Sequence, residues 1–239
     1  MFPYDSTLIA AVAVPPRTVA DVVAIMQEID STCANTDGLK WFNWLYLQVT
    51  LAVQQRVNAV AFADPAWIAA LDVEFAGFYF AAIGAALTAG NAPGCWQAVF
   101  NARNQPAVAR IQFAFAGMNA HINHDLPQAI VANCQSTGVA PAHGTAQYSD
   151  YTALNATLDG IINTAKQELS VRLAGDALPP VNRLEDVLAA WSIAAAREAA
   201  WNNAEVLWHL RDAPPVSATF MASVDLTTAA ASKAVLIPV

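Results

Sequence analysis

The sequence predicts a single all-α domain: a helical bundle of about six to eight helices with one kinked central helix. Alanine makes up about a fifth of the chain and has the highest helix propensity of all residues. Apolar residues recur at helical spacing through most of the length, and no useful run alternates as a half-buried strand would. No linker rich in Gly, Pro or Ser divides the chain, so we expect one domain over residues 1–239, with a core at about 18–212 and weakly specified termini.

Capping residues and prolines mark where the helices begin and end. Thr18 followed by Asp21 resembles a capping box, and Asp64-Pro65 pairs an N-cap acceptor with proline at the first helical position. Pro127 lacks an N–H donor and must kink or end the helix that contains it. We expect helices over about 18–30, 37–60, 65–89, 96–105, 106–126, 149–174 and 182–211.

The remaining segments read as loops and breaks. Residues 135–147 are rich in Gly, Ser, Thr and Pro, which is typical of a loop. Ser149 is the expected cap of the next helix, and Gly175 with Pro179-Pro180 is expected to break it. Asn182 with Glu185 would cap the last helix, and Pro214-Pro215 would end it, which leaves a weakly specified tail.

Composition excludes two classes of protein. The chain has 11 basic and 19 acidic residues, a net charge of −8, with 56% hydrophobic and 13% charged residues. A disordered chain needs low hydrophobicity and high charge, and a nucleic-acid binder needs a basic surface. We therefore expect a globular protein that binds no nucleic acid.

The cysteines and the apolar segments indicate a cytoplasmic protein. Three scattered cysteines, Cys33, Cys95 and Cys134, suit reduced, partly buried thiols. The N-terminal apolar run has no preceding Lys or Arg, so it fails as a secretory signal. Residues 75–102 carry no charge, but their apolar part is short and rich in Ala and Gly. A buried helix that turns near Asn91 is favoured over a membrane span.

One short segment carries the chemistry. Between Arg110 and Asp150 the only charged side chain is Asp125, and His121 and His124 lie beside it in the string HINHDLP. On a helix these three side chains share one face, because residues three and four apart are neighbours. A lone carboxylate in an apolar segment must be hydrogen-bonded, paired, protonated or metal-bound.

Two imidazoles and a carboxylate suit a divalent metal such as zinc, iron or manganese. Three donors on one turn subtend too narrow an arc around an ion, so further ligands should come from another helix. Glu205 and His209, four residues apart, are the expected suppliers. Asn119 and Tyr79 complete the candidate catalytic set with the two histidines and Asp125. Tyr46 and Asn43 could also reach a pocket.

Three functions remain open at this level. The first is a metal-dependent hydrolase or oxygenase acting on a small, rather apolar molecule. The second is a metal-free cyclase or isomerase of secondary metabolism, with His121 or His124 as acid and base. The third is a binding or scaffold protein in which the HINHD turn is a satisfied buried network. Arg197 and Glu205 could instead form only a surface ion pair, without a functional role. His143 could be no more than an exposed loop residue. The oligomeric state is not predicted.

The strings AGMNAHINHDLP, DPAWIAALDVEFAGFYFAA and REAAWNNAEVLW resemble an uncharacterised bacterial all-helical family, a domain of unknown function. The resemblance runs from about Thr36 to Arg211, and HINHDLP is its most specific part. It implies a single helical domain in which Asn119, His121, His124 and Asp125 gather at one site. It implies no reaction.

Overall fold

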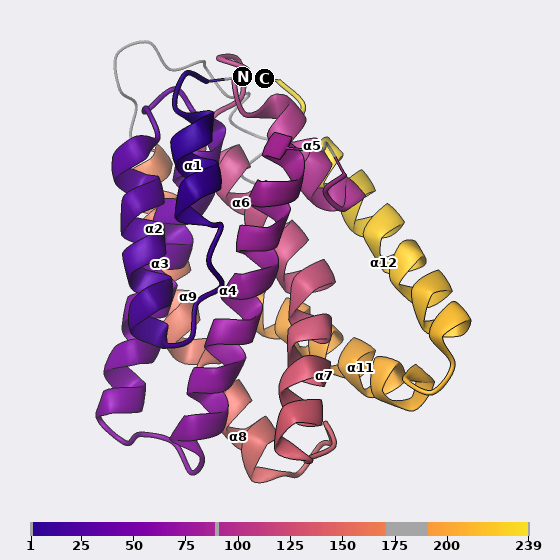
Figure 1. Cartoon of the computed structure of the whole chain (residues 1–239). Helices are drawn as coiled ribbons and strands as arrows, with labels where there is room; N and C mark the ends of the chain where they lie inside the picture. The colour runs from indigo at the N-terminus through magenta and orange to yellow at the C-terminus, as the bar shows by residue number, and fades with distance from the viewer. Residues whose placement is uncertain (1, 89–90, 171–190, 239) are drawn as a thin grey trace.

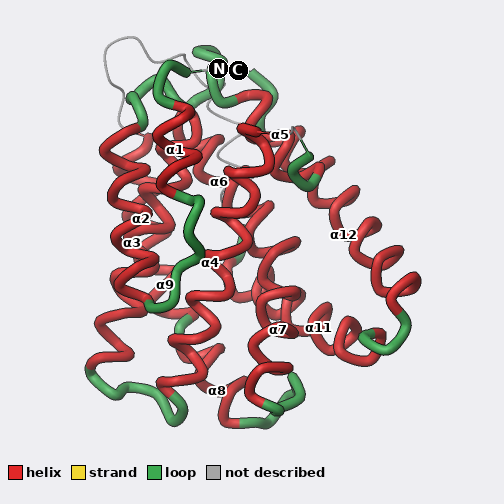
Figure 2. Tube along the Cα trace, in the orientation of Figure 1, coloured by secondary structure: helices red, strands yellow, loops and turns green. Residues whose placement is uncertain are grey.

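The computed structural model describes residues 2–88, 91–170 and 191–238, and within these ranges the chain forms helices joined by turns and loops, with no strand (Figures 1 and 2). The all-α bundle predicted from the sequence is therefore confirmed. The described helices exceed the expected six to eight and are α1 (Asp5–Ala11), α2 (Val19–Thr32), α3 (Gly38–Asn58), α4 (Pro65–Thr88), α5 (Gly94–Ala102), α6 (Arg110–Ala120), η1 (His121–Asp125), α7 (Leu126–Thr137), α8 (Ala146–Ala153), α9 (Asn155–Ser170), α11 (Ile193–Leu210) and α12 (Pro214–Val235).

Two of the predicted start signals, at Thr18 and Asp64, act as expected. The Thr18 hydroxyl accepts a hydrogen bond from the Asp21 N–H at 3.1 Å, and the Asp21 carboxylate accepts one from the Thr18 N–H at 2.9 Å, which completes the capping box of α2. Asp37 caps α3 through the Leu39 N–H at 3.0 Å. Asp64 accepts from the Trp67 N–H at 3.0 Å at the start of α4. Side-chain acceptors thus satisfy first-turn donors that a helix leaves unpaired.

Two predicted helix starts are wrong. The helix expected from Pro106 begins at Arg110 instead, because Gln112 caps it by accepting from the Ala109 N–H at 2.8 Å. The helix expected from Ser149 to 174 is two helices, α8 and α9, and Thr145 rather than Ser149 caps the first by accepting from the Tyr148 N–H at 3.1 Å.

The C-terminal prediction also needs correction. Gly175, Pro179-Pro180, Asn182 and Glu185 lie outside the described residues, and the described part of this region opens with α11, whose N-cap is Ser192. The expected tail after Pro214-Pro215 is α12, with proline in its first turn. Proline is well tolerated there because the first N–H groups of a helix have no intrahelical partner.

The interruption expected at Pro127 takes the form of a π-helical turn. Residues His121–Asp125 form η1 between α6 and α7, and the Leu126 N–H donates to the carbonyl of His121, five residues back. Pro127 then lies in the first turn of α7. Single π turns inside α-helices are rare, and they frequently occur at functional sites.

The central helix α6 packs closely against α3, and glycines permit the approach from both sides. A Cβ on Gly38 of α3 would lie 2.3 Å from the ring of Phe113 on α6. Conversely, a Cβ on Gly117 of α6 would lie 2.4 Å from the ring of Phe42 on α3. Each glycine makes room for an aromatic side chain of the other helix.

The charge-free segment 75–102, predicted as a buried, turning helix, comprises the C-terminal part of α4 and all of α5. Among the described residues, α4 is the one helix long and apolar enough to cross a membrane by length and composition alone, with 44% of its most apolar window buried inside the structure. In this structure it packs against α3 and α7 (Figure 1).

Candidate functional site

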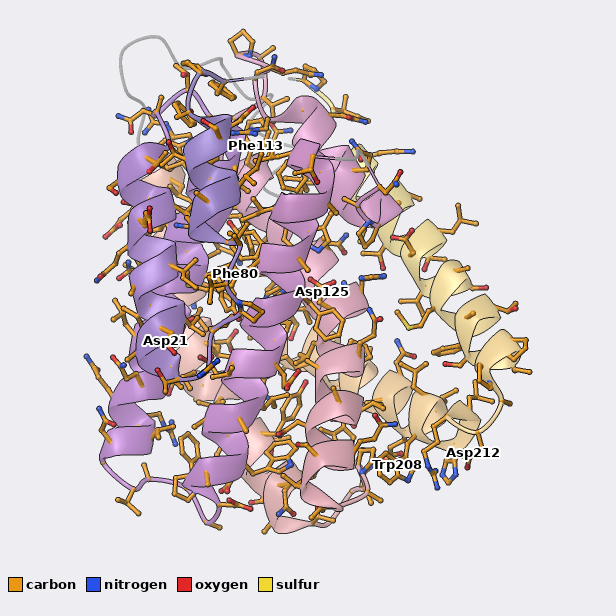
Figure 3. The ribbon with its side chains drawn as sticks, in the orientation of Figure 1. Asp21, Phe80, Phe113, Asp125, Trp208 and Asp212 are labelled. Atoms are coloured by element: carbon orange, nitrogen blue, oxygen red, sulfur yellow. The ribbon has the colours of Figure 1, made fainter. Side chains whose placement is uncertain are left out.

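The π turn places Asp125, labelled in Figure 3, in the interior of the molecule. There it accepts hydrogen bonds from three aromatic N–H groups. Its Oδ2 lies 2.9 Å from Nδ1 of His121 and 2.8 Å from Nε1 of Trp96. Its Oδ1 lies 2.7 Å from Nδ1 of His124. The carboxylate is 1% exposed, so its hydrogen bonds replace water completely.

These partners determine the protonation of the site. Burial alone would raise the pKa of Asp125, but the hydrogen bonds from His121 and His124 outweigh it and the pKa is lowered. An ionised carboxylate only accepts hydrogen bonds, so both histidines carry a proton on Nδ1. Burial lowers the pKa of His121 despite the opposing effect of Asp125, so this imidazole is neutral. Its Nε2 is then an unprotonated base.

Aromatic side chains surround His121 and fix its ring. Phe75 of α4 stacks on it with ring centroids 3.5 Å apart and planes 5° from parallel. Tyr46 of α3 meets it edge-on at 4.5 Å, and Phe42 does so at 5.6 Å. Nε2 of His121 is buried and has no hydrogen-bond partner among the described residues.

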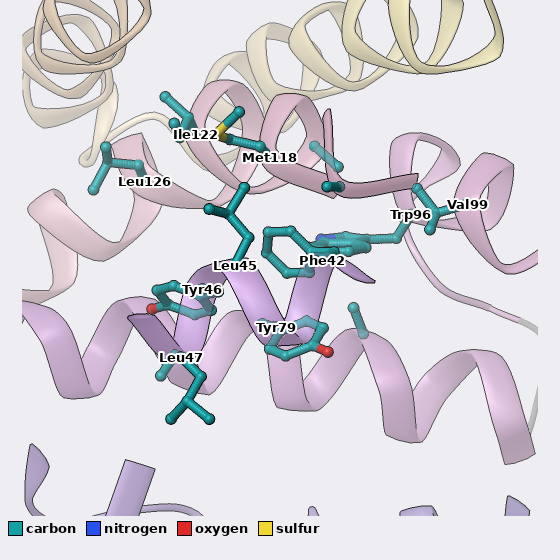
Figure 4. Close-up of a cluster of buried hydrophobic side chains, with 14 of the residues drawn as sticks. Phe42, Leu45, Tyr46, Leu47, Tyr79, Trp96, Val99, Met118, Ile122 and Leu126 are labelled. Carbon is teal, nitrogen blue, oxygen red and sulfur yellow. The ribbon is translucent and has the colours of Figure 1, made fainter. Parts of the chain in front are cut away.

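His121 forms part of the wall of a small apolar cavity of about 50 Å³. The cavity lies between α3, the central helix, α4, α9 and the start of α11. Figure 4 shows its surroundings: Met118 of α6 and Ile122 of η1 lie opposite Leu45 and Phe42 of α3. The other lining residues are Tyr46, Val49, Phe75, Leu158, Ile162 and Ile193. His121 is therefore the one nitrogen base among the lining residues, and Tyr46 is the one other lining residue with a polar side-chain group.

Asn119 and Tyr79 lie near this site but their polar atoms are engaged elsewhere. The Asn119 amide donates to the Thr228 carbonyl at 3.0 Å and to the Ser232 hydroxyl at 2.9 Å, so it attaches α6 to α12. The Tyr79 hydroxyl donates to Asn43 at 3.4 Å. The ring of Tyr79 lies 6.1 Å from that of His121.

The structure does not bring Glu205 and His209 to the π turn. Glu205 lies 2.8 Å from Nδ1 of His143, and His143 also lies 2.9 Å from Glu198. His209 is exposed near the end of α11. The expected five-ligand metal set is therefore corrected: α11 turns these two side chains toward the α7–α8 loop and solvent. His143, expected as an exposed loop residue, is 43% exposed and paired with both carboxylates.

Two further expectations about neighbouring residues are settled by contacts. Arg197 is not in a surface pair with Glu205; it is buried, and it donates to the Tyr151 carbonyl at 2.7 Å and to Asn155 at 2.8 Å. The Asn43 amide donates to the Met26 carbonyl at 2.9 Å, away from the cavity. Of the two residues expected to reach a pocket, only Tyr46 lines this one.

Sequence reasoning missed Trp96 and Phe75 as partners of the site. Trp96 lies 29 residues before Asp125, and the only signal for it was that a buried indole N–H needs an acceptor. Phe75 belonged to a recognised helical stripe with Tyr79, but its stacking on His121 depends on how α4 packs against the π turn.

Comparison with known proteins gives a family and no activity. No curated protein matches the chain, and no solved structure matches it. One family matches residues 19–238, which include the whole π turn and α12. The chain therefore belongs to the family of unknown function DUF5995.

Proposed function

We propose that this protein is an acid–base enzyme that isomerises or cyclises a small, mainly apolar molecule, with His121 as the general base. The observation that carries the proposal is the geometry of one imidazole. Nδ1 of His121 lies 2.9 Å from Asp125, its Nε2 is buried without a partner among the described residues, and its ring lines an apolar cavity. A buried polar atom left without a partner costs stability, and function is a simple reason to retain it.

The chemistry needs no co-reactant. Nε2 takes a proton from a carbon of the bound molecule, and the imidazolium that forms is stabilised by the Asp125 carboxylate. The electron pair of the broken C–H bond shifts within the molecule, and the same proton returns to a different carbon. Atoms and electrons are unchanged in total, which is the balance of an isomerisation or a redox-neutral cyclisation.

Phe75 controls access in this proposal. The cavity of about 50 Å³ admits only a group of methyl size beside His121. Phe75 is half-buried and covers one face of the imidazole. A larger ligand would reach Nε2 when this ring swings away, and its π system could take the place of Phe75 against His121.

The test is proton exchange at acidic carbons, since the substrate is unidentified. The protein is incubated in D₂O with cyclohexanone and 2-cyclohexenone, and deuterium incorporation is followed by NMR. We expect exchange above the buffer rate for the wild type, a further increase for Phe75→Ala, and a loss of at least tenfold for His121→Gln and Asp125→Asn.

The matched control is His143→Gln, which removes a histidine whose partners are surface carboxylates. Its exchange rate should equal that of the wild type. A wild-type rate equal to buffer for both ketones, with unchanged ¹⁵N shifts of His121 on their addition, would reject the enzyme. In that case the scaffold alternative stands, in which Asp125→Asn lowers the melting temperature and has no catalytic effect.

A further inference from the structure

A second cluster of donor atoms lies on the other side of Asp125. Cys95 in the first turn of α5, His124 in the π turn and Asp225 in α12 each offer one ligand atom, and these atoms all lie within 4.8 Å of one another. Around a tetrahedral zinc ion, sulfur, nitrogen and oxygen ligands at about 2.0–2.3 Å from the metal lie roughly 3.3–3.8 Å apart. Side-chain shifts of about 1 Å would therefore bring the three atoms to ligand distance.

Asp225 is held in place by the N-terminus of α5. Its Oδ2 accepts from the Gly94 N–H at 2.8 Å and its Oδ1 accepts from the Cys95 N–H at 2.9 Å. A Cβ on residue 94 would lie 2.9 Å from Oδ2, so glycine is needed for this close approach. Each carboxylate oxygen has a second lone pair, which remains for a metal.

His124 has a carboxylate partner of the kind that histidine ligands of metals commonly have. Its Nδ1 lies 2.7 Å from Oδ1 of Asp125. This bond leaves Nε2 as the nitrogen for a metal and sets the orientation of the ring. A carboxylate on the far nitrogen makes the imidazole a better ligand.

The charges in this region fit a cation. The carboxylates of Asp125 and Asp225 both flank His124, and Cys95 becomes a third anion if its thiol ionises. Burial, followed by the charge of Asp125 and the hydrogen bond with Asp225, raises the pKa of this thiol, so the free cysteine is a poor nucleophile. Its side chain is also fully buried, which leaves no path for a substrate. A divalent ion bound between these atoms would stabilise the thiolate.

We propose that Cys95, His124 and Asp225 bind one zinc-class divalent ion, with water in a fourth position. The soft thiolate together with an imidazole and a carboxylate favours Zn²⁺ or Co²⁺ over Mg²⁺ or Ca²⁺. The ion would join α5, the π turn and α12, three elements that are distant in sequence. Asp125 would then serve two neighbours at once, His124 at the metal through Oδ1 and His121 at the cavity through Oδ2.

The experiment titrates the chelator-treated, reduced full-length chain with Co²⁺. We expect one equivalent to bind, with a thiolate-to-cobalt charge-transfer absorption, and Zn²⁺ to displace it. Saturation with Zn²⁺ should raise the melting temperature by several degrees, because an ion that binds only the folded state stabilises it.

Cys95→Ser should abolish the charge-transfer absorption, and Asp225→Asn should weaken Co²⁺ binding at least tenfold. The matched control is Cys134→Ser, which removes another buried thiol, on α7, and should keep both the absorption and the stoichiometry. Circular dichroism establishes that each variant is folded.

Two results would overturn the site: less than a tenth of an equivalent of Co²⁺ bound by the wild type, or an absorption that persists in folded Cys95→Ser. The proton-exchange activity proposed for His121 is measured separately, so failure of one proposal is distinguishable from failure of the other.

Discussion

Asp72 and Asp125 are both buried carboxyl groups, yet their pKa values shift in opposite directions. Asp125 has three aromatic N–H donors and its pKa is lowered. Asp72 of α4 is 7% exposed, and its Oδ2 has no hydrogen-bond partner among the described residues. Burial without compensation raises its pKa from 3.8 to about 7. The number of donors, rather than the depth of burial, separates the two carboxyl groups.

The raised pKa of Asp72 predicts a stability that falls with rising pH. Below about pH 4 the group is protonated in both the folded and the unfolded state, so it has no effect on stability. Between 3.8 and about 7 the unfolded state ionises while the folded state keeps its proton, so the free energy of unfolding decreases as the pH rises. Above about 7 the penalty is constant. Asp72→Asn should remove this dependence.

The measurement is urea unfolding of the wild type and Asp72→Asn at pH 4.5, 6 and 8. The difference between the two isolates this group, since all other titrations cancel. The free energy of unfolding of Asp72→Asn, minus that of the wild type, should increase by a few kcal/mol from the lowest to the highest pH. A constant difference across the series would show that Asp72 is ionised in the folded protein or already satisfied by water.

At the residue scale, local patterns were predictable and long-range partners were not. Helical spacing correctly predicted that His121 and Asp125 share a face, and they form a hydrogen bond four residues apart. Trp96 and Asp225 reach the same neighbourhood from 29 and 100 residues away in the chain. Nothing in the local sequence specifies such pairings, because they depend on how whole helices pack.

At the scale of elements, the contact between α3 and α6 depends on the reciprocal pair Gly38 and Gly117. Each glycine faces an aromatic ring of the other helix at a distance that a Cβ cannot occupy. The same contact places Phe42 against His121, with ring centroids 5.6 Å apart. Helix spacing and the shape of the candidate site are therefore linked through Phe42.

Gly117→Ala should accordingly destabilise the protein by about 1–3 kcal/mol, the usual cost of overpacking a core. The new methyl group would lie 2.4 Å from Phe42 and force α3 and α6 apart or the ring out of its position. The control is Gly77→Ala on α4, where a Cβ meets nothing within 4 Å. That change should stabilise slightly, because alanine is the better helix former. Urea unfolding followed by circular dichroism measures both. Equal stabilities for the two variants would contradict the close-approach argument.

The elements themselves were predictable where capping signals are unambiguous. Thr18, Asp37 and Asp64 each accept a first-turn N–H, as their sequence context indicates. The C-terminal helix α12 was missed because Pro214-Pro215 both prevents α11 from continuing and suits the first turn of a new helix. Sequence alone gave no means to choose between the two roles.

At the scale of the whole molecule, a buried ionic network ties the N-terminal segment to the bundle. Arg103, directly after α5, donates to both carboxylate oxygens of Asp37 and lies 3.0 Å from Asp5 of α1. The Tyr4 hydroxyl donates to Asp37 at 3.0 Å. All three charged residues are buried, with exposures of 5% or less. This low-charge protein therefore places part of its few charges inside, where each has a partner.

Arg103→Met should cost about 3–5 kcal/mol of stability, because it leaves two buried carboxylates without their cation. The matched control is Arg17→Met, since Arg17 is exposed and its loss should change stability by less than about 0.5 kcal/mol. Thermal and urea unfolding of both variants provide the measurement. Similar stabilities for the two would mean that water or protonation compensates the buried carboxylates.

The π turn constrains the number of residues in the segment HINHD as well as their identities. A π turn contains one residue more than the α-helical turn it replaces. Deleting one residue from His121–Asp125 would let α6 run into α7 as a continuous α-helix, and α7 would keep its face toward α4 and α11 because the π turn accommodates its extra residue within a single turn. The π turn itself would be lost, and with it the present placement of His121 and His124 around Asp125. A gap at this place in an alignment therefore marks the loss of the π turn, even where both histidines and the aspartate are retained.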